Sequence, residues 1–104
     1  MDNKNAQDNQ IQIELPEDIA QGTYSNLAII AHSSSEFVVD FVRIVPGLPK
    51  AKVQSRIILT PEHAKRLLYA LKENISRYES QYGTINIETP GSFFPPIKGN
   101  IGEA

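Results

Sequence analysis

Residues 59–83 read LTPEHAKRLLYALKENISRYESQYG, and both ends of this stretch carry helix signals. Thr60 suits the N-cap, where its hydroxyl accepts a hydrogen bond from an unpaired backbone N–H. Pro61 suits the first helical position because it has no N–H to leave unpaired, and Gly83 suits the position after the last turn. We therefore predict one long amphipathic helix over residues 61–82.

The predicted helix has one apolar face. Its apolar residues recur at alternating spacings of four and three, with Leu67 beside them, and are Ala64, Leu68, Leu71, Ile75, Tyr78 and Tyr82. A helix of this kind buries its apolar face. We expect the stripe to pack across one face of a sheet, although the same spacing also fits a helix-to-helix contact across a two-fold axis.

The segments before the helix predict that sheet. Apolar and polar residues alternate, or β-branched and aromatic residues gather, in four segments: about 10–15, 23–33, 37–45 and 51–59. The polar link Ser33–Glu36 and the pair Pro46-Gly47 are typical of turns. The link 16–22 has room for one helical turn, with Gly22 free to take positive φ. These features predict an antiparallel meander.

The predicted fold class is α+β, with three to four antiparallel strands and the helix packed on one face. A further short strand is predicted at 84–88. We expect a single domain over residues 10–88, a disordered tail over 1–9, and a Pro/Gly-rich tail over 89–104 that carries Phe93 and Phe94. Because so small a core stabilises a chain only weakly, we expect a homodimer whose second subunit covers the other face of the sheet.

Composition excludes several classes of site. The chain has 104 residues and no cysteine, which rules out disulfides, thiolate nucleophiles and cysteine-ligated metal centres. Its N-terminal segment lacks an apolar run long enough for a signal peptide or a membrane span. We therefore expect a cytoplasmic protein that does not bind a membrane.

Charge is distributed unevenly along the chain. Residues 1–40 carry seven acidic residues against Lys4, and residues 41–77 carry eight basic residues against Glu62 and Glu73. The basic segment 43–77 is a hypothetical nucleic-acid or polyanion surface. We favour the alternative that acidic and basic strands lie side by side and neutralise each other. The residues we assign to a binding surface are those that meet near the start of the helix: Arg56, His63, Lys65 and Arg66.

Catalytic chemistry lacks a convincing set of residues. His32 and His63 are the two histidines of the chain, and they lie on separate predicted elements without ligand-like spacing. The serines after His32 lack the strand-turn-helix context of a hydrolase nucleophile, and glycine-rich phosphate loops are absent. We expect no metal, no cofactor and no enzyme activity. An enzyme that uses His32, Asp40 and His63 remains the least favoured alternative.

Several motifs resemble a known family. They are Tyr24-x-Asn26, Glu36-Phe37-x-x-Asp40-Phe41, Arg56-Ile57-x-Leu59-Thr60-Pro61-x-His63-Ala64-Lys65 and Asn74-Ile75-x-x-Tyr78-Glu79-x-x-x-Gly83-x-Ile85. With these motifs the chain resembles a family of short prokaryotic proteins classed as a domain of unknown function. The resemblance covers roughly residues 11–87. It implies a single-domain protein and brings no reaction or ligand with it.

The function predicted from the sequence is a non-catalytic homodimeric module that binds or scaffolds another protein. Nucleic-acid binding through residues 43–77 is the alternative, and it is not favoured. The sequence does not name the protein partner.

Overall fold

The structure is a computed structural model, and it describes residues 10–87. The predictions for the tails 1–9 and 89–104, including Phe93 and Phe94, therefore lie outside the described residues. So does the last residue of the short strand expected at 84–88.

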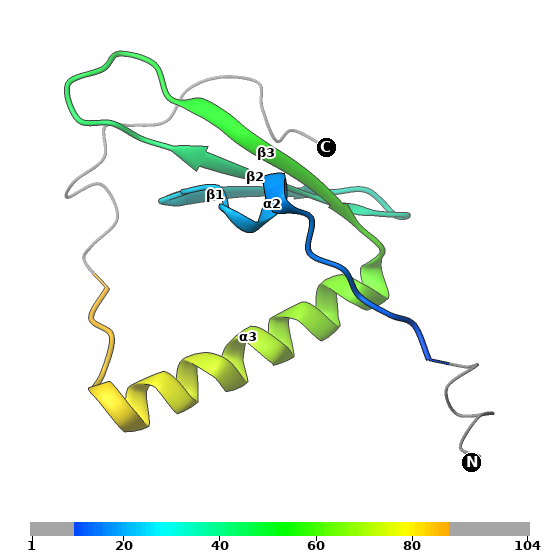
Figure 1. The fold of residues 1–104 in the computed structure, drawn as a ribbon. Helices are drawn as coiled ribbons and strands as arrows, with labels where there is room; N and C mark the ends of the chain where they lie inside the picture. The colour runs from blue at the N-terminus through cyan, green and yellow to red at the C-terminus, as the bar shows by residue number, and fades with distance from the viewer. Residues whose placement is uncertain (1–9, 88–104) are drawn as a thin grey trace.

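Three strands and a long helix make up the domain (Figure 1). The elements in chain order are the one-turn helix α2 (Glu17–Ala20), the strands β1 (Leu27–His32), β2 (Phe37–Arg43) and β3 (Lys52–Leu59), and the helix α3 (Pro61–Tyr82). The strands form one antiparallel sheet in the order β1-β2-β3. The predicted α+β class and the meander are thereby confirmed.

Two of the predicted strands do not form. Residues 10–15 and 84–87 belong to neither a strand nor a helix, and Ile11, Ile13 and Leu15 are exposed. The alternation of apolar and polar residues specifies a strand with two different faces, but a strand also needs a neighbour that pairs with its backbone. Residues 10–15 have no such neighbour within the described part of the chain.

The turns follow the predicted chemistry. Gly22 follows the one-turn helix with φ +79°, and Gly47 has φ +88° in the link between β2 and β3. Leu48 N donates to Val45 O at 3.1 Å, which closes the turn around Pro46 and Gly47. Both glycines occupy a region of φ that residues with a Cβ rarely adopt.

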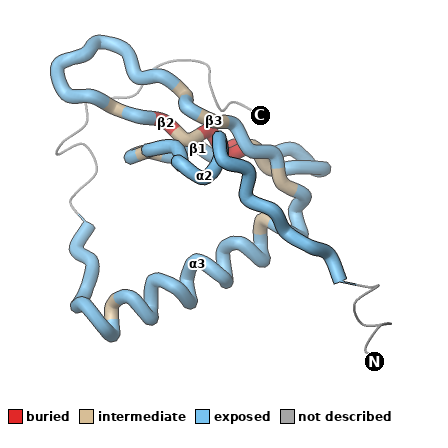
Figure 2. Tube along the Cα trace, viewed as in Figure 1, coloured by how far each residue is buried: buried red, intermediate tan, exposed pale blue. Residues whose placement is uncertain are grey.

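Within residues 10–87, the buried residues all lie in the sheet, as Figure 2 shows. The buried apolar residues among those described are Ala31, Val39 and Val42, and the carboxylate residue Asp40 is fully buried beside them. This core is small for a domain of this length, because most apolar residues of the sheet keep part of their surface exposed. The sheet by itself therefore supplies limited hydrophobic stabilisation.

Helix α3 has the predicted bounds, and its caps explain them. The Thr60 side chain accepts a hydrogen bond from His63 N at 3.2 Å, Pro61 occupies the first turn, and Gly83 N donates to Glu79 O at 2.9 Å. Both ends of the helix are thus fixed by local interactions that the sequence specifies.

The expected packing of α3 on the sheet of its own chain is not confirmed. No residue of α3 is buried, and the extensive packing among the described elements joins neighbouring strands (Figures 1 and 2). Thr60 alone separates β3 from α3, and the helix runs back below the sheet at an angle that carries it away from the strands (Figure 1). A helix that returns onto its sheet ordinarily follows a loop of several residues.

Neither helix within residues 10–87 combines the length and the apolar character that crossing a bilayer requires.

Candidate functional site

The four residues predicted to form a binding surface, here called the basic corner, come from two elements. Arg56 belongs to β3, and His63, Lys65 and Arg66 belong to the first two turns of α3. Because a single residue links these elements, the basic corner follows the bend between strand and helix. Arg56 and Arg66, however, are both paired with carboxylates.

Arg56 binds Asp40 across the ladder between β2 and β3. The two residues are register partners, and Arg56 donates from Nε to Oδ1 at 2.6 Å and from Nη2 to Oδ2 at 2.8 Å. The Asp40 side chain is fully buried, whereas that of Arg56 is about half exposed. This two-pronged geometry is the strong form of the Arg–carboxylate contact.

The ion pair also sets the protonation of Asp40. The hydrogen bonds from Arg56, supported by its positive charge, lower the pKa of Asp40 below its ordinary value of 3.8 and outweigh the opposing effect of burial. The same contact raises the pKa of Arg56. Asp40 is therefore an ionised, doubly bound carboxylate, which makes it a poor candidate for a proton-transfer group.

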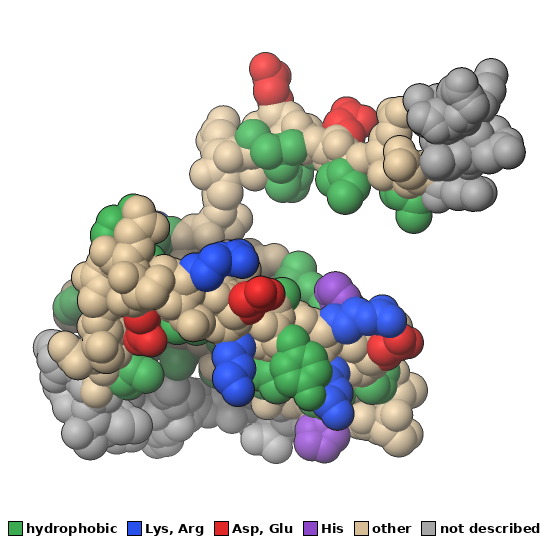
Figure 3. Space-filling view, turned by 90° about the horizontal axis from the view of Figure 1, so that it is seen from below, with side chains coloured by type: hydrophobic (Ala, Val, Ile, Leu, Met, Phe, Trp, Pro, Cys, Tyr) green, Lys and Arg blue, Asp and Glu red, His purple; other side chains and the backbone are tan. Residues whose placement is uncertain are grey.

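The other ion pairs lie within α3. Arg66 pairs with Glu62 and Arg77 pairs with Glu73, each four residues apart on the exposed helix surface. Figure 3 views the molecule from below, and its Lys and Arg side chains are interspersed with acidic and hydrophobic ones. The basic residues on this side are therefore separated from one another by acidic or hydrophobic side chains.

The residues of the alternative catalytic set do not come together. The His32 ring lies against Phe37, with ring centroids 5.3 Å apart, and His63 lies in the first turn of α3. Asp40 pairs in register with Ile29, three residues from His32, so the two side chains point to opposite faces of the sheet. Residues 10–87 contain no group of three or more His, Asp or Glu side chains arranged to hold a metal ion.

A hydrogen-bonded clamp that the sequence analysis missed joins the start of β1 to the end of β2. Ile44 N donates to Asn26 Oδ1 at 2.8 Å, and Asn26 Nδ2 donates to Ile44 O at 3.0 Å. One side chain thus satisfies both backbone groups of a residue beyond the ladder. Two residues earlier, the Tyr24 ring lies 5.8 Å from the guanidinium of Arg43. In the sequence, the motif Tyr24-x-Asn26 was the signal that could have indicated this clamp.

Helix α3 exposes an unusually large number of apolar side chains for a globular domain. Its large apolar side chains keep between 39% and 67% of their surface exposed, and they are Leu67, Leu68, Leu71, Ile75, Tyr78 and Tyr82. Monomeric soluble proteins rarely expose contiguous apolar patches above a few hundred Å². A surface of this kind usually marks an interface.

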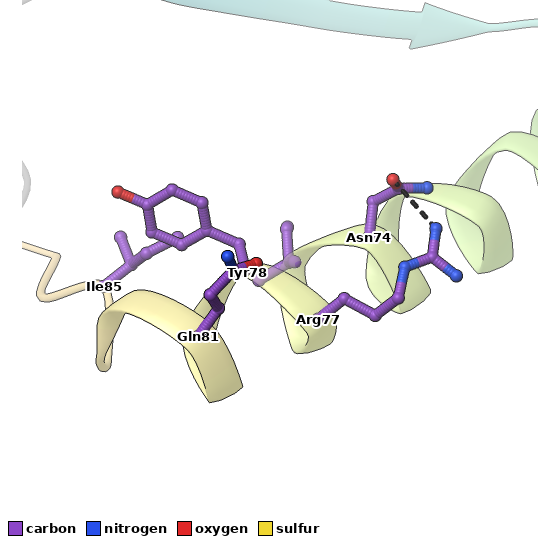
Figure 4. Close-up of a pocket in the computed structure, with 6 residues that line it drawn as sticks. Asn74, Arg77, Tyr78, Gln81 and Ile85 are labelled. Carbon is purple, nitrogen blue, oxygen red and sulfur yellow. Dashed lines mark hydrogen bonds between the residues drawn. The ribbon is translucent and has the colours of Figure 1, made fainter.

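A shallow hollow, here called the α3 groove, opens along the C-terminal half of this surface (Figure 4). It has a volume of about 510 Å³ and is lined by Asn74, Ile75, Arg77, Tyr78, Gln81 and Ile85. Arg77 Nη2 donates to Asn74 Oδ1 at 3.1 Å along its wall. Tyr78 and Ile75 supply its apolar part, and two of the apolar-stripe positions therefore border it.

Comparison with family models gives a match over residues 1–87 to the family described as "Protein of unknown function (DUF3467)". The chain belongs to this family. This match confirms the resemblance to a family of unknown function that the motifs indicated. The DUF3467 description assigns no reaction, ligand or partner.

Many of the motif residues have structural roles in the DUF3467 domain of this chain. Asn26 clamps two strands, Asp40 and Arg56 form the buried ion pair, and Thr60 caps α3. At the other end of α3, Glu79 Oε2 accepts a hydrogen bond from Ile85 N at 2.9 Å. These residues of the motifs thus take part in contacts that hold the fold together.

The chain is also similar to the adenine phosphoribosyltransferase of Bifidobacterium longum (strain NCC 2705). The two are 31% identical over 80 residues, which cover 72% of this chain and 42% of that enzyme. The chain thus spans less than half the length of this relative. No solved structure matches the chain.

Proposed function

We propose that this protein is a small, non-catalytic homodimeric module that binds or scaffolds another protein. The observation that carries the proposal is the exposed apolar surface of α3. The helix is capped at both ends, and yet none of its residues is buried against its own chain. A helix in water gains most of its stability from burying its apolar face. A second copy provides that burial without any other component.

The size of the core supports the same proposal. With Ala31, Val39 and Val42 as its buried apolar residues, the described sheet has little hydrophobic stabilisation of its own. Small domains of this kind commonly gain stability by oligomerisation. Ile30 and Ile57, which flank Val39 in register on one sheet face, are 62% and 43% exposed and add to the surface that an assembly buries.

The absence of catalysis is part of the proposal. Asp40 has both carboxylate oxygens bound by Arg56, and His32 points to the other face of the sheet. The similarity to an adenine phosphoribosyltransferase covers less than half of that enzyme, so it supports no transferase activity by itself. An assay for phosphoribosyl transfer to adenine with the purified chain tests this part, and turnover above the uncatalysed rate would contradict it.

Nucleic-acid binding is the less favoured alternative. Arg56, Arg66 and Arg77 each pair with a carboxylate, which reduces the positive charge available to phosphates. A titration of duplex DNA and single-stranded RNA at two salt concentrations tests it. Binding that weakens steeply with salt would favour the alternative, and no retention at low salt is the result that we expect.

Light scattering over a range of concentrations tests the assembly itself. A mass of twice the 11.6 kDa chain at tens of micromolar is the expected result. A strictly monomeric mass at that concentration would contradict the homodimer. The cytoplasmic location is a separate prediction that this measurement does not address.

A further inference from the structure

We infer that the second copy binds through its own α3, so that the two helices lie antiparallel with Ala64 opposite the partner's Tyr82. This inference rests on the proposed homodimer and specifies which surface joins the two chains. Four features of α3 carry it: the width of the apolar stripe, the sizes of its side chains, the α3 groove, and the charges along its margin.

The stripe has the width of a helix-to-helix contact. Its members, Ala64, Leu68, Leu71, Ile75, Tyr78 and Tyr82, alternate between spacings of four and three, which is a repeat of 3.5 residues. That repeat produces a narrow contact line that a second helix covers, whereas a helix that covers a sheet usually has a broader apolar face. The exposed stripe therefore matches another helix better than it matches a sheet.

Side-chain sizes favour the antiparallel direction. In that register the smallest stripe residue, Ala64, faces a large one, the partner's Tyr82. Leu68 faces the partner's Tyr78, and Leu71 faces the partner's Ile75. A parallel pair would instead place two tyrosines together at one end and two alanines at the other. Because close packing penalises both crowding and voids, the antiparallel register fills the contact more evenly.

The α3 groove receives the remaining apolar side chain. Leu67 is adjacent to the stripe and 43% exposed, so the stripe alone does not account for it. In the antiparallel register the partner's Leu67 falls beside Gln81, on the side of the helix that Asn74, Tyr78 and Gln81 line. Asn74, Arg77, Tyr78 and Gln81 follow the spacing i, i+3, i+4, i+7, which is the outline of a hole that a side chain of a neighbouring helix enters.

Charges on the opposite margin agree with the same register. Lys65 lies beside the partner's Glu79, and the two-fold axis repeats this contact at the other end. Lys72 lies near the axis and meets the partner's Lys72, but the long methylene chain of lysine carries each ammonium outward to water. Two favourable contacts thus accompany one like-charge contact that solvent screens.

Cysteine cross-linking tests the register, because the natural chain has no cysteine. The double variant Ala64→Cys/Tyr82→Cys is oxidised and analysed by denaturing electrophoresis beside its two single variants. Arg66→Cys/Ser80→Cys serves as the matched control, since both positions lie on the opposite side of α3. Positions 64 and 82 are about 27 Å apart along one helix, which prevents a disulfide within a chain.

The expected result is a closed covalent dimer from the double variant, with no linkage in either single variant or in the control. Linkage of Ala64→Cys alone would indicate parallel helices and would overturn the inference. A double variant that light scattering shows to be dimeric but that does not link would also overturn it, while leaving the homodimer intact. A monomeric wild-type chain would overturn both proposals.

Discussion

Arg56 binds the buried carboxylate of Asp40 with two hydrogen bonds, at positions that face each other directly in the β2–β3 ladder. The contact joins the acidic segment 1–40, which contains Asp40, to the basic segment 41–77, which contains Arg56. It also places the single buried charge of the described residues next to the small apolar core. Removal of Arg56 would leave this buried carboxylate without its counter-charge.

Loss of the arginine should destabilise the sheet. Arg56→Gln leaves a buried carboxylate without its cation, which is the costly way to break an ion pair. We expect the Tm to fall by more than about 5 °C in a thermal scan followed by circular dichroism. The control is Arg66→Gln, which breaks an exposed pair and should leave the Tm within about 3 °C of the wild type. Equal effects of the two variants would contradict the structural role of Asp40.

Low pH should remove the contribution of the Asp40–Arg56 pair to the free energy of unfolding. The pKa of Asp40 in the folded chain lies below 3.8, so the ionised form stabilises the fold above that pH. This stability should decline as the pH falls below the ordinary value and through the folded-state pKa. Urea unfolding of the wild type and Asp40→Asn over this range is the measurement. The difference between them should be largest near neutrality and shrink in acid, and a constant difference would show that the charge does not matter.

The Asn26 clamp should contribute measurably to stability. Asn26→Ala removes two hydrogen bonds to Ile44 at an exposed site, so we expect a loss of about 1 kcal/mol in the free energy of unfolding. Gln54→Ala, which removes a weaker local contact on β3, should cost less than about 0.5 kcal/mol. Urea unfolding at one fixed chain concentration provides both values, since the stability of a dimer depends on concentration. An Asn26→Ala variant as stable as Gln54→Ala would rule out the clamp.

Gly83 should be the most sensitive position at the end of α3. Its φ of +100° and ψ of 166° define a conformation that other residues rarely adopt. Gly83→Ala should therefore destabilise the chain by about 1–3 kcal/mol, although open space surrounds the position. Ser80→Ala, one turn earlier, is the control and should cost less than about 0.5 kcal/mol. The same urea titration compares them, and a neutral Gly83→Ala would contradict the observed backbone geometry.

Local signals made most of the fold predictable. The helix bounds follow from Thr60, Pro61 and Gly83, whose preferences act within a few residues. The turn at Gly47 follows from the same kind of local chemistry. The strand expected at residues 10–15 was wrong, because an alternating pattern describes the faces of a strand and contains no information about its hydrogen-bonding neighbour.

Contacts between residues far apart in the sequence were harder to predict. The sequence placed Asp40 and Arg56 on adjacent strands, but the ion pair depends on the register, and the irregularity of the ladder at Phe41 and Val42 shifts that register. In the same way, the apolar stripe of α3 predicted burial without specifying what covers it. The pattern of the stripe is the same whether the sheet of the same chain or a second chain buries it.

The most direct test of the homodimer through α3 compares two neighbouring residues with the same exposure. Leu68 lies in the apolar stripe and Tyr69 lies outside it, and each keeps 58% of its surface exposed. The measurement is sedimentation equilibrium of the wild type, Leu68→Glu and Tyr69→Glu. We predict a dimeric wild type, a dimeric Tyr69→Glu and a Leu68→Glu whose dissociation constant rises at least about tenfold. A Leu68→Glu variant that dimerises as tightly as Tyr69→Glu, or a monomeric wild type, would contradict the account.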